Sequence, residues 1–287
     1  MNHLLRELAP ISDSGWRMLD EEARVRVTPA LAARRLVDYA GPHGWQHSAT
    51  NLGRTVRLSR GPCDGVAALQ RRVLPLVELR ADFELSRGEL RDAGRGAEDA
   101  DLGPLDTAAL RMARAENTAV FHGYPEAGIT GIVESSPHTP MVLGGSADAF
   151  PAPVAGAVEQ LLRCGIEGPY GLALGEEQYS RVAETAEHGG YPLLEHLQKI
   201  LEGPIVWTPG LSGGAVLSLR GGDFLLDAGE DLSIGYDHHD GESVALYIEE
   251  SFSFRVATPE AAVALSAGGA GATRPRAAAR SGTRRQL

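Results

Sequence analysis

Cysteine, lysine and long apolar runs are all scarce in this chain of 287 residues. The two cysteines, Cys63 and Cys164, lie far apart and form no C-x-x-C motif, so we expect reduced thiols and no cysteine-based metal site. No apolar run approaches the ~20 residues that a membrane-spanning helix needs. The N-terminal segment carries charge inside its short apolar stretch and lacks a signal-peptide cleavage pattern, so we expect a cytoplasmic protein.

Lysine is almost absent, because Lys199 is the only one and all other cationic residues are arginines. The 38 aspartates and glutamates outnumber the 27 lysines and arginines, and the formal net charge is −11. Sequence-independent binding of nucleic acid depends on cationic side chains that displace counterions from phosphates. Neither a Walker A motif nor a G-x-G-x-x-G motif after a strand is present. We therefore expect no nucleic-acid partner and no cofactor.

The N-terminal segment has the periodicity of a helix. Its apolar residues recur every three to four positions and so share one helical face (Trp16, Leu19, Ala23, Val27 and Leu31). Thr28 suits a helix N-cap and Pro29 suits the first helical position. The sequence therefore predicts two helices in line, the second ending near Val37.

An extended segment follows the break at Gly41-Pro42. Residues 50–59 and 66–85 are extended in pattern, with strict alternation of apolar and charged residues over 77–85, and residues 61–65 form a turn sequence between them. Together they predict a long two-stranded arm. Because a two-stranded ribbon is marginally stable alone in water, we expect it to lie against another surface, in this subunit or a neighbour.

The rest of the chain mixes helices and strands without regular alternation, which favours an α+β fold over a Rossmann or barrel fold. Residues 86–103 are rich in glycine and charge and are predicted to form a loop. Helices are expected at 105–121, around 154–162, at 176–187 and at 193–201. Strands are expected at 170–174, 205–207, 215–219, 224–227, 232–236, 244–249 and 252–256.

A possible nucleophile lies in residues 210–214, which match G-x-S-x-G with Ser212 at the centre. That motif exposes its serine by bending a strand into a helix, but the residues after Ser212 are typical of a second strand. One of Asp223, Asp227 or Asp231 with His238 would have to complete a triad within a short run of hairpins. A glycine-rich turn explains the segment better, so we predict no catalytic residue.

Histidines offer a second chemical possibility. His43 and His47 are four apart, but they follow a Gly-Pro break, so a helical metal-binding pair is not expected. His238 and His239 lie in a predicted polar turn. With no further ligand placed by a recognised spacing, the sequence predicts no metal site.

Blocks of this sequence, in order from about residue 4 to 266, resemble those of the family 1 encapsulins, once described as linocin-type bacteriocins. The most specific are Ile-Glu-Gly-Pro-Tyr at 166–170 and Asp-Leu-Ser-Ile-Gly-Tyr at 231–236. The others are Leu8-Ala9-Pro10 with Trp16, Arg34 to Asp38, Gly41 to Trp45, Leu74 to Arg80, Phe83 to Leu85, His188 to Pro192, and Arg220 to Phe224.

The resemblance implies the α+β fold of tailed-phage major capsid proteins, with a P-domain, an A-domain and an extended E-loop. On this pattern residues 1–45 are the N-terminal helices of the P-domain, 46–85 are the E-loop arm and 86–129 hold the spine helix of the P-domain. Residues 130–220 resemble the A-domain and 221–266 the final P-domain strands. The arginine-rich residues 267–287 have little apolar surface to bury and are expected to be disordered, on the outside of the particle.

The resemblance also implies a structural function and not an enzymatic one. Encapsulin subunits assemble into an icosahedral nanocompartment, enclose cargo enzymes such as dye-decolorising peroxidases or ferritin-like proteins, and admit small molecules through pores. A C-terminal peptide of the cargo docks on the inner wall at positions that match Arg34, Asp38, Leu232, Ile234 and Tyr236. The residues matching the five-fold pore loop are His188, Gly189, Gly190 and Tyr191, with one more glycine than the usual motif. From the residues alone, Arg34 and Asp38 would form a local helical ion pair.

Two departures from related proteins carry expectations of their own. Gly88 stands where some encapsulins have an aromatic residue that stacks on flavin, so no flavin is expected. With Lys199 as the only lysine, covalent cross-linking of the kind seen in some phage capsids is not expected either. A serine hydrolase using Ser212 and a phage capsid protein are the alternatives that the sequence leaves open.

Overall fold

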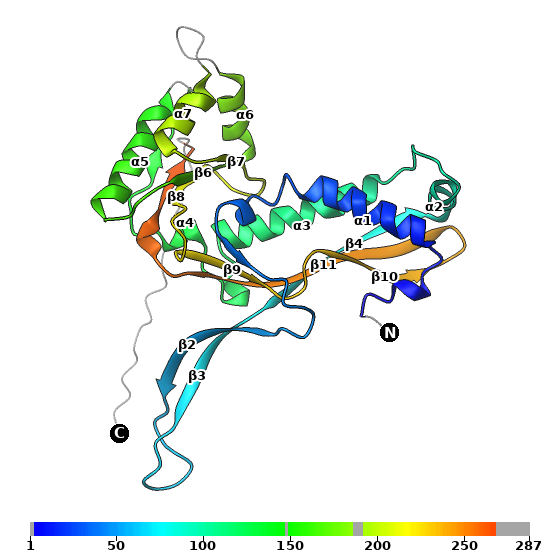
Figure 1. The fold of residues 1–287 in the computed structure, drawn as a ribbon, viewed down its shortest axis with the longest axis horizontal. Coiled ribbons are helices and arrows are strands. Elements are labelled where there is room, and N and C mark those ends of the chain that lie inside the picture. Colours follow the sequence, from blue (N-terminus) through cyan, green and yellow to red (C-terminus); the bar gives the residue numbers. More distant parts are fainter. Residues whose placement is uncertain (1–2, 147–148, 186–191, 268–287) are drawn as a thin grey trace, which may run out of the picture.

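The computed structural model describes residues 3–146, 149–185 and 192–267. These residues form two five-stranded sheets with their helices, and a two-stranded arm that leaves the body (Figure 1). The predicted α+β mixture of elements is confirmed. No helix in the described part of the chain is long and apolar enough to span a membrane.

The first sheet, called the long sheet here, is organised around one strand. β11 is fourteen residues long and pairs with β10 and β9 along its length, while β4 runs antiparallel to it over residues 243–252. β1 adds to β9 in parallel. The strands are β1 (Asp38–Ala40), β4 (Val77–Ser86), β9 (Phe224–Ala228), β10 (Ser233–His239) and β11 (Ser243–Val256).

Three helices cover the long sheet. Trp16 and Leu19 of α1 and Leu105 of α3 are buried against Phe83 of β4 and Ile234 of β10, which together form one apolar core. Ser12 begins α1 because its Oγ accepts a hydrogen bond from the backbone N–H of Gly15. The helices are α1 (Asp13–Val27), α2 (Arg87–Gly94) and α3 (Gly103–Phe121).

The second sheet has the strand order β5-β12-β8-β6-β7. Every residue of β6 and β8 is buried, which explains their unbroken apolar sequences. Helices α5 and α7 pack on this sheet with their apolar faces in a second core. The elements are α4 (Ile132–Ser135), β5 (Met141–Val142), α5 (Pro151–Arg163), β6 (Tyr170–Leu174), α6 (Glu176–Glu184), α7 (Leu193–Leu201), β7 (Ile205–Trp207), β8 (Gly214–Ser218) and β12 (Ala262–Ser266).

The arm consists of β2 (Ala49–Arg57) paired with β3 (Leu69–Pro75), and Figure 1 shows it projecting away from both sheets. The sequence predicts a second arm strand over 66–85, but its latter half, β4, pairs with β11 in the long sheet. Apolar side chains of the arm remain exposed in the single subunit: Val56 47%, Leu58 43%, Val66 48%, Leu69 64% and Val73 50%.

Three other segments differ from the sequence predictions. The predicted second helix ending near Val37 is only a 3-10 turn, η2 (Ala33–Arg35), followed by β1. The loop predicted over 86–103 contains α2, which begins at Ser86, whose Oγ accepts from the backbone N–H of Gly88. The two strands predicted within 244–256 are one continuous strand.

A buried asparagine in α3 joins three segments. The side chain of Asn117 donates to the carbonyl oxygens of Ala30 at 2.8 Å and Pro209 at 3.0 Å. Its Oδ1 accepts from the backbone N–H of Ala33 at 3.0 Å. Because Asn117 is fully buried, these bonds satisfy backbone groups that water does not reach.

We predict that Asn117→Ala lowers the free energy of unfolding by about 2–3 kcal/mol, because it leaves buried donors and acceptors without partners. The measurement is thermal unfolding followed by circular dichroism. Asn51→Ala is the matched control, since Asn51 is exposed in the arm and its Oδ1 accepts a hydrogen bond from the nearby backbone N–H of Gly53. Equal melting temperatures for the two variants would contradict the prediction.

Candidate functional site

A groove of about 520 Å³ lies between α1 and the start of β10. It brings together three of the five residues that the sequence assigns to peptide binding, Arg34, Leu232 and Ile234. The other lining residues are Arg6, Asp20, Ala23, Arg24, Val27, Thr28, Leu31, Ala109, Asp231, Ser233 and Ile248.

Apolar side chains from both sides form the walls of this groove. Leu232 is half-buried and packs against Val27 and Leu31 in a small cluster behind α1. Ile234 is only 2% exposed and belongs to the core between α1 and the long sheet. Leu232 and the half-buried Ala23 therefore present more surface to an occupant than Ile234 does.

The other two predicted residues lie elsewhere. Asp38 begins β1, and its Oδ2 accepts a hydrogen bond of 2.6 Å from the backbone N–H of Gly222, so it stabilises the turn before β9. Tyr236 is buried in the core, and its hydroxyl is 2.6 Å from Nδ1 of His239. Neither residue lines the groove. The local ion pair predicted between Arg34 and Asp38 is wrong, because the chain between them is not helical.

Arg34 instead contacts three carboxyl groups from three other segments. Its Nε donates to Oε2 of Glu116 on α3 at 2.7 Å, and its Nη2 donates to Oε2 of Glu250 on β11 at 3.0 Å. Its Nη1 donates to Oδ1 of Asp231 at 2.6 Å. The guanidinium also stacks on the ring of Tyr39, 4.8 Å from its centroid. Burial alone would lower the pKa of Arg34. The attraction of the carboxylates is stronger than this effect, so the pKa of Arg34 is raised overall.

Two of these carboxyl groups are fully buried and face each other. Burial raises the pKa of Glu116, against the opposing effect of Arg34. Burial and the negative charge of Glu116 raise the pKa of Glu250 well above its ordinary value. The Oε1 atoms of both residues are buried and have no other hydrogen-bond partner within the residues described. Two buried carboxyl groups beside one guanidinium do not both ionise readily, so the titrations of Glu116 and Glu250 depend on each other.

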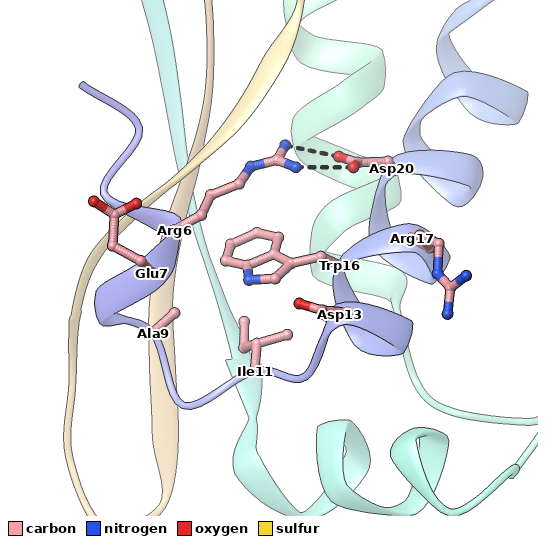
Figure 2. A pocket seen from close by; sticks show the side chains of 8 residues that line it. All are labelled: Arg6, Glu7, Ala9, Ile11, Asp13, Trp16, Arg17 and Asp20. Carbon is pink, nitrogen blue, oxygen red and sulfur yellow. Dashed lines mark hydrogen bonds and ion pairs between the residues drawn. The ribbon is translucent and has the colours of Figure 1, made fainter. Parts of the chain in front are cut away.

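A second hollow of about 710 Å³ adjoins the groove at the N-terminal segment. Figure 2 shows Arg6 of η1 (Arg6–Leu8) extending over Trp16 to reach Asp20 of α1. Two hydrogen bonds of 2.8 and 2.7 Å join the Arg6 guanidinium to the Asp20 carboxylate, and Arg6 Nε donates to the carbonyl of Ile234 at 2.7 Å. Arg6 and Asp20 line both the groove and the second hollow, so the ion pair between these residues separates the two spaces. No motif in the sequence indicated a role for Arg6 or Asp20.

Ser212 is exposed at the turn before β8 and is followed by a strand, not by the helix that a nucleophile elbow requires. The imidazole of His122 lies beside it, but its Nε2 accepts a hydrogen bond of 3.1 Å from the backbone N–H of Ser212 and is therefore not free to accept a serine proton. Asp223 pairs with Arg220, and His238 with Asp237. The proposed triad is therefore not assembled. His188, Gly189, Gly190 and Tyr191 lie outside the described residues.

We predict that Glu250→Gln makes stability less dependent on pH. Because the pKa of Glu250 is raised in the fold above the ordinary 4.5, its contribution is complete below that value and is lost as the pH rises through the raised pKa. Glutamine does not titrate, so the melting temperature of the variant should not show this loss. The difference in melting temperature, variant minus wild type, should therefore increase as the pH rises. Glu84→Gln, on an exposed position of β4, is the control. Parallel profiles for Glu250→Gln and wild type would contradict a raised pKa of Glu250 in the fold.

Comparison with known proteins supplies the family. Residues 1–253 match the protein family described as "Encapsulating protein for peroxidase". The type 1 encapsulin shell protein of Rhodospirillum rubrum is 47% identical over 270 residues, which cover 92% of this chain and 96% of that protein.

Solved structures give the same fold. The virus-like particle from Pyrococcus furiosus has a TM-score of 0.58 at 18% sequence identity, covering 85% of this chain and 97% of that one. The structure titled Mycobacterium phage Bobi has a TM-score of 0.55 at 13% identity, covering 84% and 91%. The predicted phage-capsid fold is confirmed. Together with the family match over most of the chain, these findings show that the protein belongs to the encapsulin shell protein family.

Proposed function

We propose that this protein is the subunit of an icosahedral cytoplasmic nanocompartment that encloses a cargo enzyme and performs no bond chemistry itself. The observation that carries this proposal is the arm. It extends from the body of the subunit (Figure 1). Its apolar side chains are exposed, as expected of a segment that is buried only when copies of the chain assemble.

Burial of the arm gives assembly a driving force. Both faces of the ribbon contribute, because Leu69 lies opposite Arg57 and Val56 lies opposite Gln70 in the register, which places Leu69 and Val56 on different faces. Each large side chain removed from water contributes about 1.5–3 kcal/mol. Summed over many subunits, contacts of this size hold a shell together without covalent cross-links.

The groove beside α1 is the proposed docking site for the cargo. Its apolar walls and its length along the start of β10 suit a short extended peptide with aliphatic anchors. The cargo we propose is a dye-decolorising peroxidase or a ferritin-like protein, held by its C-terminal peptide. Arg34 contributes through Asp231, which it holds at the edge of the groove, while Ile234 supports the wall from below. In the same proposal residues 188–191 line the five-fold pore.

We predict that Ala23→Asp prevents cargo loading but not shell assembly. A carboxylate placed against an apolar peptide is desolvated without a partner, so loading should fall at least ~10-fold. The probe is a fluorescent protein fused to the C-terminal peptide of an encapsulin-associated dye-decolorising peroxidase, co-expressed with the shell. The readout is fluorescence that co-elutes with particles on size-exclusion chromatography.

Val25→Asp is the matched control, because Val25 is on the same helix, is 51% exposed and does not line the groove. It should load like wild type. Normal loading of Ala23→Asp shells would exclude the groove as the docking site. Failure of wild-type shells to load would exclude a peroxidase peptide as the ligand.

We predict that Leu69→Asp abolishes shell formation and leaves a folded smaller species. Leu69 is 64% exposed, so a charge there costs the single subunit little, but it would be buried unpaired in the assembled shell. Negative-stain electron microscopy of the protein expressed alone measures the outcome, with circular dichroism as the test of folding. Leu69→Met preserves the apolar contact and should form normal shells. Normal shells from Leu69→Asp would contradict burial of the arm.

A further inference from the structure

Two histidines and an aspartate meet at the root of the arm. His43 and His47 precede β2, and Asp227 is in β9 of the long sheet. One ligand atom from each of the three residues lies within 4.8 Å of the other two. The sequence separates Asp227 from the histidines by most of the chain, so spacing alone gave no sign of this cluster.

The two imidazoles approach different oxygens of one carboxylate. His43 Nε2 is 2.8 Å from Asp227 Oδ1, and His47 Nε2 is 3.5 Å from Asp227 Oδ2. The two rings are tilted by 49° with centroids 4.7 Å apart. Nitrogen and oxygen donors from three residues therefore converge on one small space.

Backbone contacts hold the cluster in place. The N–H groups of His43 and Gly44 donate to the carbonyls of Ala228 and Gly229, at 3.0 and 2.7 Å, so the loop lies against the end of β9. Gly41, at φ +120°, has no room for a side chain, because a Cβ there would be 2.4 Å from the Ala228 carbonyl oxygen. The position of the histidines is thus determined by the backbone and not only by their own side-chain contacts.

Hydrogen bonding explains this arrangement poorly. Asp227 Oδ1 is a buried atom with no hydrogen bond of acceptable geometry within the described residues, although His43 Nε2 is only 2.8 Å away. The oxygen therefore lies off the axis of the ring N–H. On the other side, Thr50 Oγ1 already donates to Oδ2, where His47 is at the limit of hydrogen-bond distance. Side chains that bind one cation lie close together in this way without good hydrogen bonds between them, because the donor atom of each side chain is directed at the ion and not at the neighbouring side chain.

We propose that His43, His47 and Asp227 form a binding site for a divalent transition metal ion such as Zn²⁺. Two imidazole nitrogens and one carboxylate oxygen are a ligand set that zinc and neighbouring metals favour. The donors of a tetrahedral zinc site are about 3.4 Å apart, so the present spacing requires a side-chain adjustment of about 1 Å. His43 is 45% exposed, which leaves a route for the ion and room for water as a fourth ligand.

A metal ion in this position joins the loop before β2 to the long sheet. It would therefore restrict the direction in which the arm leaves the body, at the point where Thr50 of β2 already contacts Asp227. The inference does not depend on the cargo or on the groove beside α1.

The test is isothermal titration of the purified full-length protein with zinc chloride. Wild type should bind one tight zinc ion per chain, and His43→Gln and His47→Gln should each weaken that binding at least ~10-fold. His238→Gln is the matched control, because His238 is exposed and pairs with its neighbour Asp237 away from this cluster. It should bind like wild type.

Thermal unfolding gives a second readout that does not rely on the heat of binding. Zinc should raise the melting temperature of wild type and His238→Gln, and should raise that of His43→Gln much less. Unchanged zinc affinity in both cluster variants would overturn the proposal, as would the absence of saturable binding to wild type. Normal circular dichroism of the variants without zinc excludes misfolding as the cause of a loss.

Discussion

The buried charge of Arg34 is the interaction on which the arrangement of this subunit depends. It comes from the short turn between α1 and β1, and it contacts α3 through Glu116, β11 through Glu250 and the start of β10 through Asp231. A buried guanidinium needs carboxylate partners, and buried carboxylates need the guanidinium. Helix α3, strand β11 and the N-terminal segment are therefore restricted to one relative placement.

This use of Arg34 has a consequence for recognition at the groove. The one positive charge of Arg34 faces three carboxyl groups, those of Glu116, Glu250 and Asp231. Little of the Arg34 charge remains for an occupant of the groove. If the groove holds a cargo peptide as proposed, the affinity must come mainly from the apolar surfaces of Ala23, Val27 and Leu232 and from shape. In that case Arg34 acts by holding Glu116, Glu250 and Asp231 in position and not by direct contact with the peptide.

The local pattern of apolar and polar residues was sufficient to predict the bounds of some helices and strands, namely those in which the apolar residues are the buried ones. The apolar run of β6 and the amphipathic α7 have the predicted bounds, 170–174 and 193–201. Burial on both sides of a strand requires a continuous apolar run, and burial on one side of a helix requires apolar residues every three to four positions, so both patterns can be recognised in the sequence. The segment around Asp38 was predicted to be helical because its apolar spacing fits a helix. Pairing with β9 overrides that preference, and Asp38 then bonds to the backbone of Gly222 instead of to Arg34.

Pairing between strands far apart in the sequence determines which part of residues 66–85 belongs to the long sheet and which part belongs to the arm, and local pattern did not predict this division. Residues 66–85 all look extended, but only 77–85 alternates strictly between apolar and charged residues, and that half is the one buried on one face against α3 and paired with β11. The half that lacks alternation, 69–75, has no core face in the subunit and remains exposed. An extended segment without a buried face in its own subunit needs another surface to stabilise it, and the proposed assembly supplies that surface from another copy of the chain.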